Sequence, residues 1–275
     1  MVSQSLRASV RRAEHSARVV LGDLNRRMDP QWLRRRRLAI EGTPAVIVGV
    51  YRFRNATLVS DLLHPRGTEW DVRLWALDEP AIGLQEETVG VGPGAKFHLV
   101  DQLLKGVDLV GRTVVVIDDD IAFQRGTLAR FLGVMDEAQL DIAQPAHSRR
   151  SHANYRIVRM APRSTARLTT FVEIGPIFAF SPRAHPHLLP FGPEAGMGWG
   201  LERFWQVVAG RLNLRMGVVD EVLLDHLVPA ASEYDWKQAH RNADQFLDHK
   251  QIDEHETEQA VLERWPVWRS TPPWR

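Results

Sequence analysis

Short apolar runs alternate with helical patterns along the middle of the chain. Residues 45–51, 72–77 and 113–117 are mostly apolar, as strands buried inside a sheet are. Apolar residues at helical spacing occupy 95–104 and 127–135. Strands that alternate with helices predict an α/β sheet, parallel in at least its first half.

The second half of the chain continues this pattern. Short strands are predicted at 141–144 and 155–158, a longer strand at 170–180 and a further strand at 217–220. Helical spacing returns over 199–208. In such sheets ligands bind beyond the carboxyl ends of the strands, so polar residues at those ends are the first candidates for a site.

Both ends of the chain differ from this core. We expect a basic helical arm over 1–42, a catalytic α/β domain over 43–233 and a helical, tryptophan-rich tail over 234–275 that packs on the domain. Ten arginines and three acids give residues 1–40 a charge of +7, which leaves −6 on the rest of a chain whose net charge is +1. The arm either packs on the body or on a second subunit, forming a homodimer, or contacts an anionic membrane.

Composition excludes several function classes. Cysteine is absent, which rules out disulfides, cysteine–zinc sites and thiol catalysis. No apolar segment is long enough to span a bilayer and no apolar leader follows the N-terminus, so we expect a cytoplasmic protein, peripheral at the membrane if the arm binds there. The acidic body argues against nucleic-acid binding. Arginine makes up 31 of the 35 basic residues, which indicates a GC-rich bacterial genome.

Three adjacent carboxylates, Asp118, Asp119 and Asp120, follow the apolar run 113–117. Such groups repel one another unless a positive charge lies among them. A chain without thiols binds metals through carboxylates, histidine and water, a set that suits Mg²⁺ or Mn²⁺. His226 follows an apolar segment and could add a nitrogen ligand. The alternative is a solvated acidic turn.

Two glycine-rich segments carry further candidates. Glycines at 196, 198 and 200 let the backbone approach a ligand, Trp199 offers a flat face for stacking a sugar or base, and Glu202 could accept a proton. Alternatively, Trp199 belongs to the core and Glu202 favours a helix start. Lys96, after Gly92-Pro93-Gly94, could reach a phosphate, or the segment is a plain connector.

Six pieces of the sequence together resemble the domain of unknown function 707 family and, more widely, the GT-A-fold, nucleotide-sugar-dependent glycosyltransferases. The resemblance covers residues 95–230. In order, the pieces are Asp118-x-Asp120, residues 142–146, residues 171–181, Gly198-Trp199-Gly200-Leu201-Glu202, residues 217–220 and His226. The fourth piece also resembles the acceptor-side motif of β-1,4-galactosyltransferases. One departure is Glu202, because the nearer family usually has aspartate there; the arm matches neither family.

The resemblance implies a GT-A-like (Rossmann-like) α/β fold, with a mixed, mainly parallel sheet flanked by helices. It implies that Asp118, Asp120 and His226 hold Mn²⁺ or Mg²⁺, and that Glu202 is the base of an inverting enzyme. Donor-binding candidates, taken from the resemblance and from the residues themselves, are Tyr51, Arg52, Asn55, Asp78, Lys96, Asp118, Asp119 and Trp199.

The function expected is therefore transfer of a sugar from a nucleoside diphosphate sugar, a UDP-sugar by default, to a hydroxyl of an acceptor. The acceptor could be a glycan, a lipid-linked molecule or a small molecule, and a retaining mechanism stays open. One alternative is a non-catalytic module that binds a nucleotide or glycan. Another is a metal-dependent phosphohydrolase or nucleotidyltransferase, against which the Gly-Trp-Gly-Leu-Glu piece argues.

Overall fold

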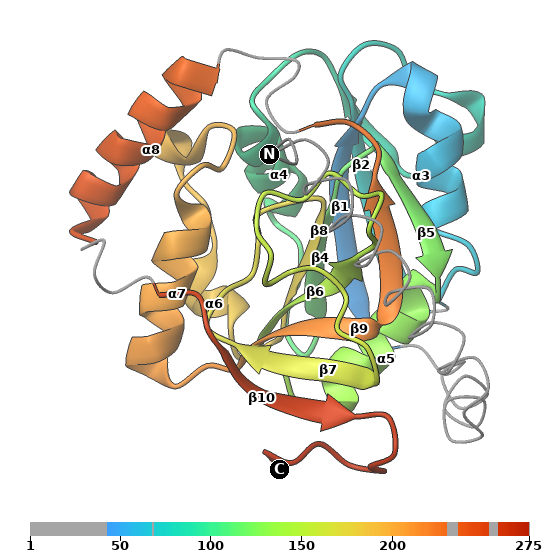
Figure 1. The fold of residues 1–275 in the computed structure, drawn as a ribbon. Coiled ribbons are helices and arrows are strands. Elements are labelled where there is room, and N and C mark those ends of the chain that lie inside the picture. Colours follow the sequence, from blue (N-terminus) through green and yellow to red (C-terminus); the bar gives the residue numbers. More distant parts are fainter. Residues whose placement is uncertain (1–42, 68, 230–235, 253–257, 275) are drawn as a thin grey trace, which may run out of the picture.

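The computed structural model describes residues 43–67, 69–229, 236–252 and 258–274 (Figure 1). The arm predicted over residues 1–42 lies outside the described residues. No helix among the residues described is both long and apolar enough to cross a membrane.

A sheet of ten strands forms the centre of the part of the chain that the structure describes. Its order is β10-β7-β9-β6-β8-β4-β1-β2-β3, and β5 pairs with β9 beside this path. The strands are β1 (Ala45–Tyr51), β2 (Trp70–Ala76), β3 (Thr88–Val91), β4 (Thr113–Ile117), β5 (Ile121–Arg125), β6 (Ile142–His147), β7 (Ser164–Thr169), β8 (Ile177–Phe180), β9 (Met216–His226) and β10 (Val261–Pro266).

The sheet is mixed. β1 pairs in parallel with β2 and β4, and β2 pairs in parallel with β3, which confirms the parallel first half. The antiparallel strand β8 then lies between β4 and β6, and β9 runs parallel to β6. The carboxyl ends of β1, β2, β4 and β6 consequently lie along one edge of the sheet.

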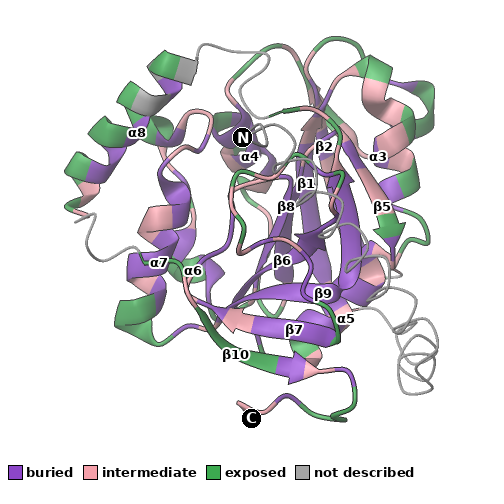
Figure 2. Ribbon diagram, viewed as in Figure 1, coloured by how far each residue is buried: buried purple, intermediate pink, exposed green. Residues whose placement is uncertain are grey.

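Helices cover both faces of the sheet (Figures 1 and 2). Alternate residues of a strand point to opposite faces, so Ile47 and Val115 pack with α3 and α5, whereas Val48 and Val116 pack with α4 and α7. The α-helices are α3 (Ala56–Leu62), α4 (Lys96–Leu104), α5 (Leu128–Glu137), α6 (His185–Leu188), α7 (Leu201–Leu212) and α8 (Trp236–Lys250), and the 3₁₀ turns are Phe53–Asn55, Ile82–Leu84 and Pro193–Ala195.

Two predicted strands are wrong. Residues 170–176 form a loop between β7 and β8, so the single long strand expected at 170–180 is confined to 177–180. Pro176 has no N–H for a strand ladder, and Thr169 already ends β7. The strand expected at 155–158 is also loop, and its Tyr155 ring packs on Phe171 with ring centres 4.6 Å apart. The apolar residues of both segments therefore pack within loops and not within the sheet.

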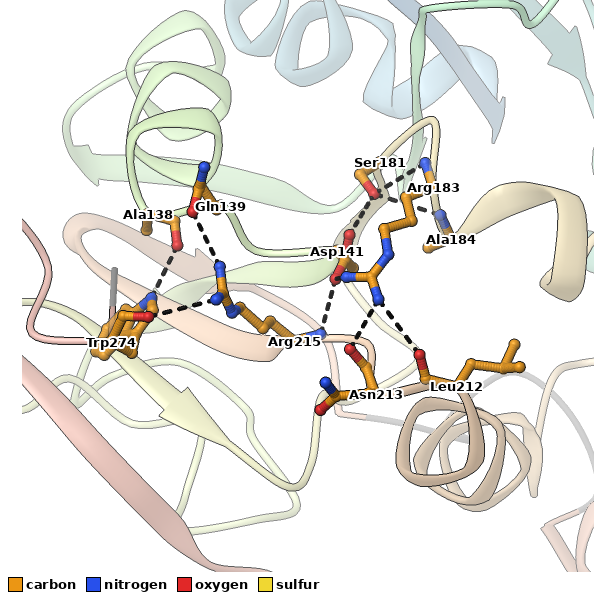
Figure 3. A network of polar contacts seen from close by, with 10 residues as sticks. All are labelled: Ala138, Gln139, Asp141, Ser181, Arg183, Ala184, Leu212, Asn213, Arg215 and Trp274. Atoms are coloured by element: carbon orange, nitrogen blue, oxygen red, sulfur yellow. Dashed lines mark hydrogen bonds and ion pairs between the residues drawn. The ribbon is translucent and has the colours of Figure 1, made fainter.

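The tail combines a helix with a strand. Residues 236–250 are helical as expected, but 261–266 form β10, which pairs with the sheet edge at β7. Trp265 is completely buried in the cluster that contains α3 and α5, and the Trp274 ring N–H donates to the Ala138 carbonyl at 2.8 Å (Figure 3). These two tryptophans dock on the body, whereas Trp268 is 62% exposed.

Asp141 organises the edge of the sheet opposite the strand ends named above. Its carboxylate accepts hydrogen bonds from the Ser181 hydroxyl, the Arg183 guanidinium and the Arg215 backbone N–H (Figure 3). Arg183 also donates to the Leu212 and Asn213 carbonyls, where α7 ends. Through these contacts, the buried Asp141 connects the starts of β6 and β9 to the end of α7.

Candidate active site

A cavity of about 370 Å³ lies at the edge formed by the carboxyl ends of β1, β2 and β4. Its position is the one expected for a ligand in an α/β sheet. The lining residues include Arg52 and Arg54 after β1, Leu77 after β2, the three aspartates after β4 and His226 at the end of β9.

Asp118, Asp120 and His226 can each offer one ligand atom, and these atoms lie within 4.8 Å of one another. Strand pairing explains how residues so distant in sequence meet. The antiparallel pair of β5 and β9 places His226 opposite Ile121, and the Leu227 N–H donates to the Asp120 carbonyl at 2.9 Å. Two carboxylates and one imidazole are a donor set that fits Mn²⁺ or Mg²⁺.

His226 already interacts with a carboxylate of this group, since its Nε2 lies 3.2 Å from an Asp120 carboxylate oxygen. Burial acts to lower the pKa of His226, but the hydrogen bond to Asp120 and the charges of Asp120 and Asp118 outweigh it, and the pKa is raised. The nearby carboxylates therefore favour the protonated imidazole, and a divalent cation bound at His226 would compete with that proton.

Lys96 supplies a second positive charge. It is the first residue of α4, is 8% exposed, and its Nζ lies 2.5 Å from an Asp118 carboxylate oxygen. The backbone of residues 175 and 176 also lies close to Asp118. The Asp118 N–H donates to the Pro176 carbonyl, and a Cβ on Gly175 would lie 3.1 Å from the Asp118 carboxylate. The loop 170–176 thus packs directly against the aspartates.

Asp119 has a different environment from its two neighbours. Its carboxylate accepts a hydrogen bond from the Arg52 N–H at 2.8 Å and another from the Asn55 side chain. Burial raises the pKa of Asp119 more than these bonds lower it. Asp119 therefore anchors the segment after β1, which places Arg52 and Asn55 in the cavity wall.

The glycine-rich segment before α7 forms another wall of the cavity with Trp199 and Glu202. Gly198 and Gly200 adopt φ values of +95° and +94°, and a Cβ on Gly198 would lie 2.1 Å from the Phe97 ring. Only glycine fits this path without displacing the ring. The glycines therefore let the backbone pass close to the Phe97 ring. The candidate functional side chains, Trp199 and Glu202, lie near these glycines in the sequence.

Glu202 is buried in the first turn of α7. One carboxylate oxygen lies 3.5 Å from the Tyr155 hydroxyl, and the other has no hydrogen-bond partner among the described residues. Burial raises the pKa of Glu202. A carboxylate with a raised pKa and an unused oxygen beside a cavity can accept a proton from a bound hydroxyl.

Nine of the eleven residues proposed from sequence line this cavity, and Tyr51 and Asp78 do not. Tyr51 is completely buried; its hydroxyl contacts the Thr88 hydroxyl at 2.8 Å and accepts from the Ala81 N–H. Asp78 is exposed and accepts from the Phe53 and Glu79 N–H groups, and the first of these bonds is the main cause of its lowered pKa. Both stabilise turns behind the cavity wall.

Glu173 is one of the cavity residues that were not predicted from the sequence, with Arg54 and Tyr155. It lies in the loop 170–176, lines the cavity, and one carboxylate oxygen accepts a hydrogen bond from the Asn154 N–H at 3.3 Å. Its other oxygen has no hydrogen-bond partner among the described residues and lies 3.7 Å from His147 Nε2. Burial raises the pKa of Glu173 to about 7 and lowers that of His147 to about 3. An acid flanked by apolar neighbours in Phe171-Val172-Glu173-Ile174 was the available signal.

Comparison with the solved structure of GalNAc-T7 supports the fold. A crystal structure of GalNAc-T7 with UDP, GalNAc and Mn²⁺ aligns with a TM-score of 0.53 at 10% identity, over 75% of this chain and 48% of that chain. This chain thus spans about half the length of that protein. The S. aureus TarS fragment 1–349 with UDP-GlcNAc aligns with a TM-score of 0.47 at 14% identity, over 77% of this chain and 68% of that one.

No protein-family model and no curated protein matches the chain. The resemblance to the domain of unknown function 707 family therefore gains no support from these comparisons. At such low identity the structural likeness concerns the fold alone. The mixed α/β sheet flanked by helices is the GT-A-like fold predicted from sequence.

Proposed function

We propose that this chain is a metal-dependent glycosyltransferase that moves a sugar from a UDP-sugar to an acceptor hydroxyl. The observation that carries the proposal is the group Asp118, Asp120 and His226, whose ligand atoms lie within 4.8 Å of one another in the wall of the cavity. The GT-A-like fold supports it, since the solved GalNAc-T7 structure with that fold contains UDP and Mn²⁺.

In this proposal the cavity has a donor side and an acceptor side. A divalent cation held by Asp118, Asp120 and His226 would neutralise the diphosphate leaving group. Lys96, Arg52 and Arg54, all in the cavity wall, add positive charge for the phosphates. Asp119 and Asn55 fix the position of the Arg52 backbone. Tyr51 and Asp78 would act indirectly, by holding the turns behind this wall.

On the acceptor side, Glu202 is the proposed base of an inverting reaction. The acceptor oxygen forms a bond to the anomeric carbon, the bond from that carbon to the diphosphate oxygen breaks, and the hydroxyl proton moves to the free oxygen of Glu202. Its buried position and raised pKa suit this role, because a base works best when its pKa lies near the operating pH. Trp199, a donor-side candidate, would provide a flat face for the sugar or the nucleobase of the donor.

The test is product analysis after incubation with UDP-sugars, Mn²⁺ and an acceptor library. We expect UDP and a glycosylated product, and the Asp120→Asn variant should form neither. Release of UMP and a sugar phosphate would instead identify a phosphohydrolase, and UDP binding without turnover of any donor would identify a binding module.

The Glu202→Gln variant tests the base separately. We expect transfer to fall by roughly 10²–10⁴-fold, the usual contribution of a general base, while the Kd of UDP with Mn²⁺ stays unchanged. Glu194→Gln, which alters an exposed acid outside the cavity wall, is the matched control. Transfer by Glu202→Gln at the wild-type rate would contradict the assignment.

A further inference from the structure

Two buried carboxylates, Glu173 and Glu202, line the same cavity, and each has an oxygen without a hydrogen-bond partner among the described residues. They are 6% and 5% exposed. Burying a carboxylate with unused hydrogen-bonding capacity costs free energy, so native proteins provide a partner for nearly all such atoms. The two free oxygens are inaccessible in the structure, so a ligand that donates hydrogen bonds would become the missing partner once the carboxylates turn toward it.

The surroundings of this pair point to a neutral, hydroxyl-rich ligand. Glu173 is held in place by the Asn154 N–H, and the Tyr155 hydroxyl approaches Glu202. His147 is neutral near pH 7 because burial lowers its pKa to about 3, and at 3.7 Å it is too far from Glu173 for a hydrogen bond. Trp199 and Tyr155 add aromatic surface to the same cavity.

Charge distinguishes this part of the cavity from the donor side. The cavity wall contains five acids but only three permanent cations, Arg52, Arg54 and Lys96. Lys96 is paired with Asp118, and Arg52 and Arg54 follow β1. Glu173 and Glu202 come instead from the loop before β8 and the start of α7. An anionic group brought to these two acids would meet like charge, and Arg203, whose charge acts on Glu202, lies outside the cavity wall.

We propose that Glu173 and Glu202 form the acceptor subsite, and that Glu173 selects a polyhydroxylated acceptor without negative charge. The inference rests on the proposed function. Adjacent hydroxyls of a sugar donate to the free carboxylate oxygens, which can only accept when ionised. The aromatic ring of Tyr155 contacts the apolar face of such a sugar ring. Glu173 is a specificity residue here, and the bond-forming chemistry remains with Glu202.

The experiment measures binding of matched neutral and anionic probes to the full chain in the presence of UDP and Mn²⁺. Two pairs serve: methyl β-D-glucoside with methyl β-D-glucuronide, and methyl β-D-galactoside with methyl β-D-galacturonide. Members of a pair differ only in a CH₂OH group or a carboxylate. Ligand-observed NMR titration at pH 7.5 gives the Kd of each probe for wild type, Glu173→Gln and the control Glu194→Gln.

We expect wild type and Glu194→Gln to bind the neutral member of at least one pair about tenfold or more tightly than the anionic member, as like-charge repulsion predicts. In Glu173→Gln this ratio should fall below about threefold, because the amide keeps the shape and loses the charge. Equal Kd values within both pairs, tighter binding of the anionic member, or the same ratio in Glu173→Gln as in wild type would overturn the inference. Absence of binding by every probe would overturn it as well.

The UDP titration that precedes each probe titration separates this inference from the proposed function. If wild type does not bind UDP with Mn²⁺, the proposed function fails, whatever the probes do. If UDP binds and the probe ratios do not behave as expected, only the assignment of Glu173 fails. UDP binding by Glu173→Gln at the wild-type Kd shows in addition that the variant is folded and its donor side intact.

Discussion

At the scale of single residues, three adjacent carboxylates occupy three separate environments. Asp118 pairs with Lys96, Asp119 accepts from the Arg52 backbone, and Asp120 faces His226. Repulsion between the acids is thus offset by a different partner for each. The sequence predicted the metal-binding pair and His226 as one group, and it could not predict these partners, because they come from the folding of distant segments.

The pKa of Glu173 makes stability depend on pH. Burial raises this pKa to about 7, so between pH 5 and pH 7.5 the folded protein binds more protons than the unfolded chain at this residue. The contribution of Glu173 to the free energy of unfolding therefore falls as pH rises. As the pH rises from 5 to 7.5, we therefore expect the free energy of unfolding of Glu173→Gln to increase relative to that of wild type.

The measurement is urea unfolding of both proteins at several pH values. His147, whose lowered pKa acts in the opposite direction, is present in both proteins, so the difference between them isolates Glu173. A difference that stays constant over this range would contradict the buried, raised-pKa environment described for Glu173.

At the scale of elements, the helices and strands that could be predicted are those with a regular pattern of apolar residues. β1 and β4 are continuous apolar runs, and α4 and α5 have helical spacing, so all four were predicted. The loop 170–176 was predicted as strand because Phe171, Val172 and Ile174 are apolar, although they pack within a loop. That error hid Glu173, since a residue assigned to a buried strand is not expected at a cavity.

The segment before α7 offers a test at this scale. Gly198→Ala should lower stability by about 1–3 kcal/mol, because the new methyl group collides with the Phe97 ring at a positive φ. It should also weaken UDP binding, since Trp199 is displaced with the backbone. Thermal unfolding and UDP titration measure the two effects.

Gly83→Ala is the matched control, because a Cβ at Gly83 would meet no atom within 4 Å. We expect this variant to unfold and to bind UDP like wild type. If Gly198→Ala behaves in the same way as Gly83→Ala, the close approach to Phe97 does not shape the site.

At the scale of the whole molecule, the C-terminal segment of the described chain completes the core. Trp265 in β10 is completely buried in the cluster that includes α3 and α5, although it lies more than two hundred residues after β1. Docking of the tail could be predicted from its tryptophans. Its strand could not, because the pattern of 261–266 is mostly exposed and only the open edge at β7 makes it a strand.

Trp265→Ala should therefore reduce the free energy of unfolding by about 3–5 kcal/mol, as for other large aromatic side chains removed from a core. Leu262→Ala, in the same strand but at a residue that is 60% exposed, should change it by less than about 0.5 kcal/mol. Chemical denaturation compares the two variants, and similar losses would mean that the tail does not contribute to the core as described.

The proposed function requires that Asp118, Asp120 and His226 hold a divalent cation for a nucleoside diphosphate. The most direct test is the melting temperature of the protein with UDP, in Mn²⁺ and in EDTA. At a UDP concentration of 100 times the Kd, binding adds roughly 2.7 kcal/mol of stability. We expect wild type to melt at a higher temperature with UDP and Mn²⁺, and EDTA or the Asp120→Ala substitution to abolish the increase. An equal increase in EDTA, or none with Mn²⁺, would contradict the proposed metal site.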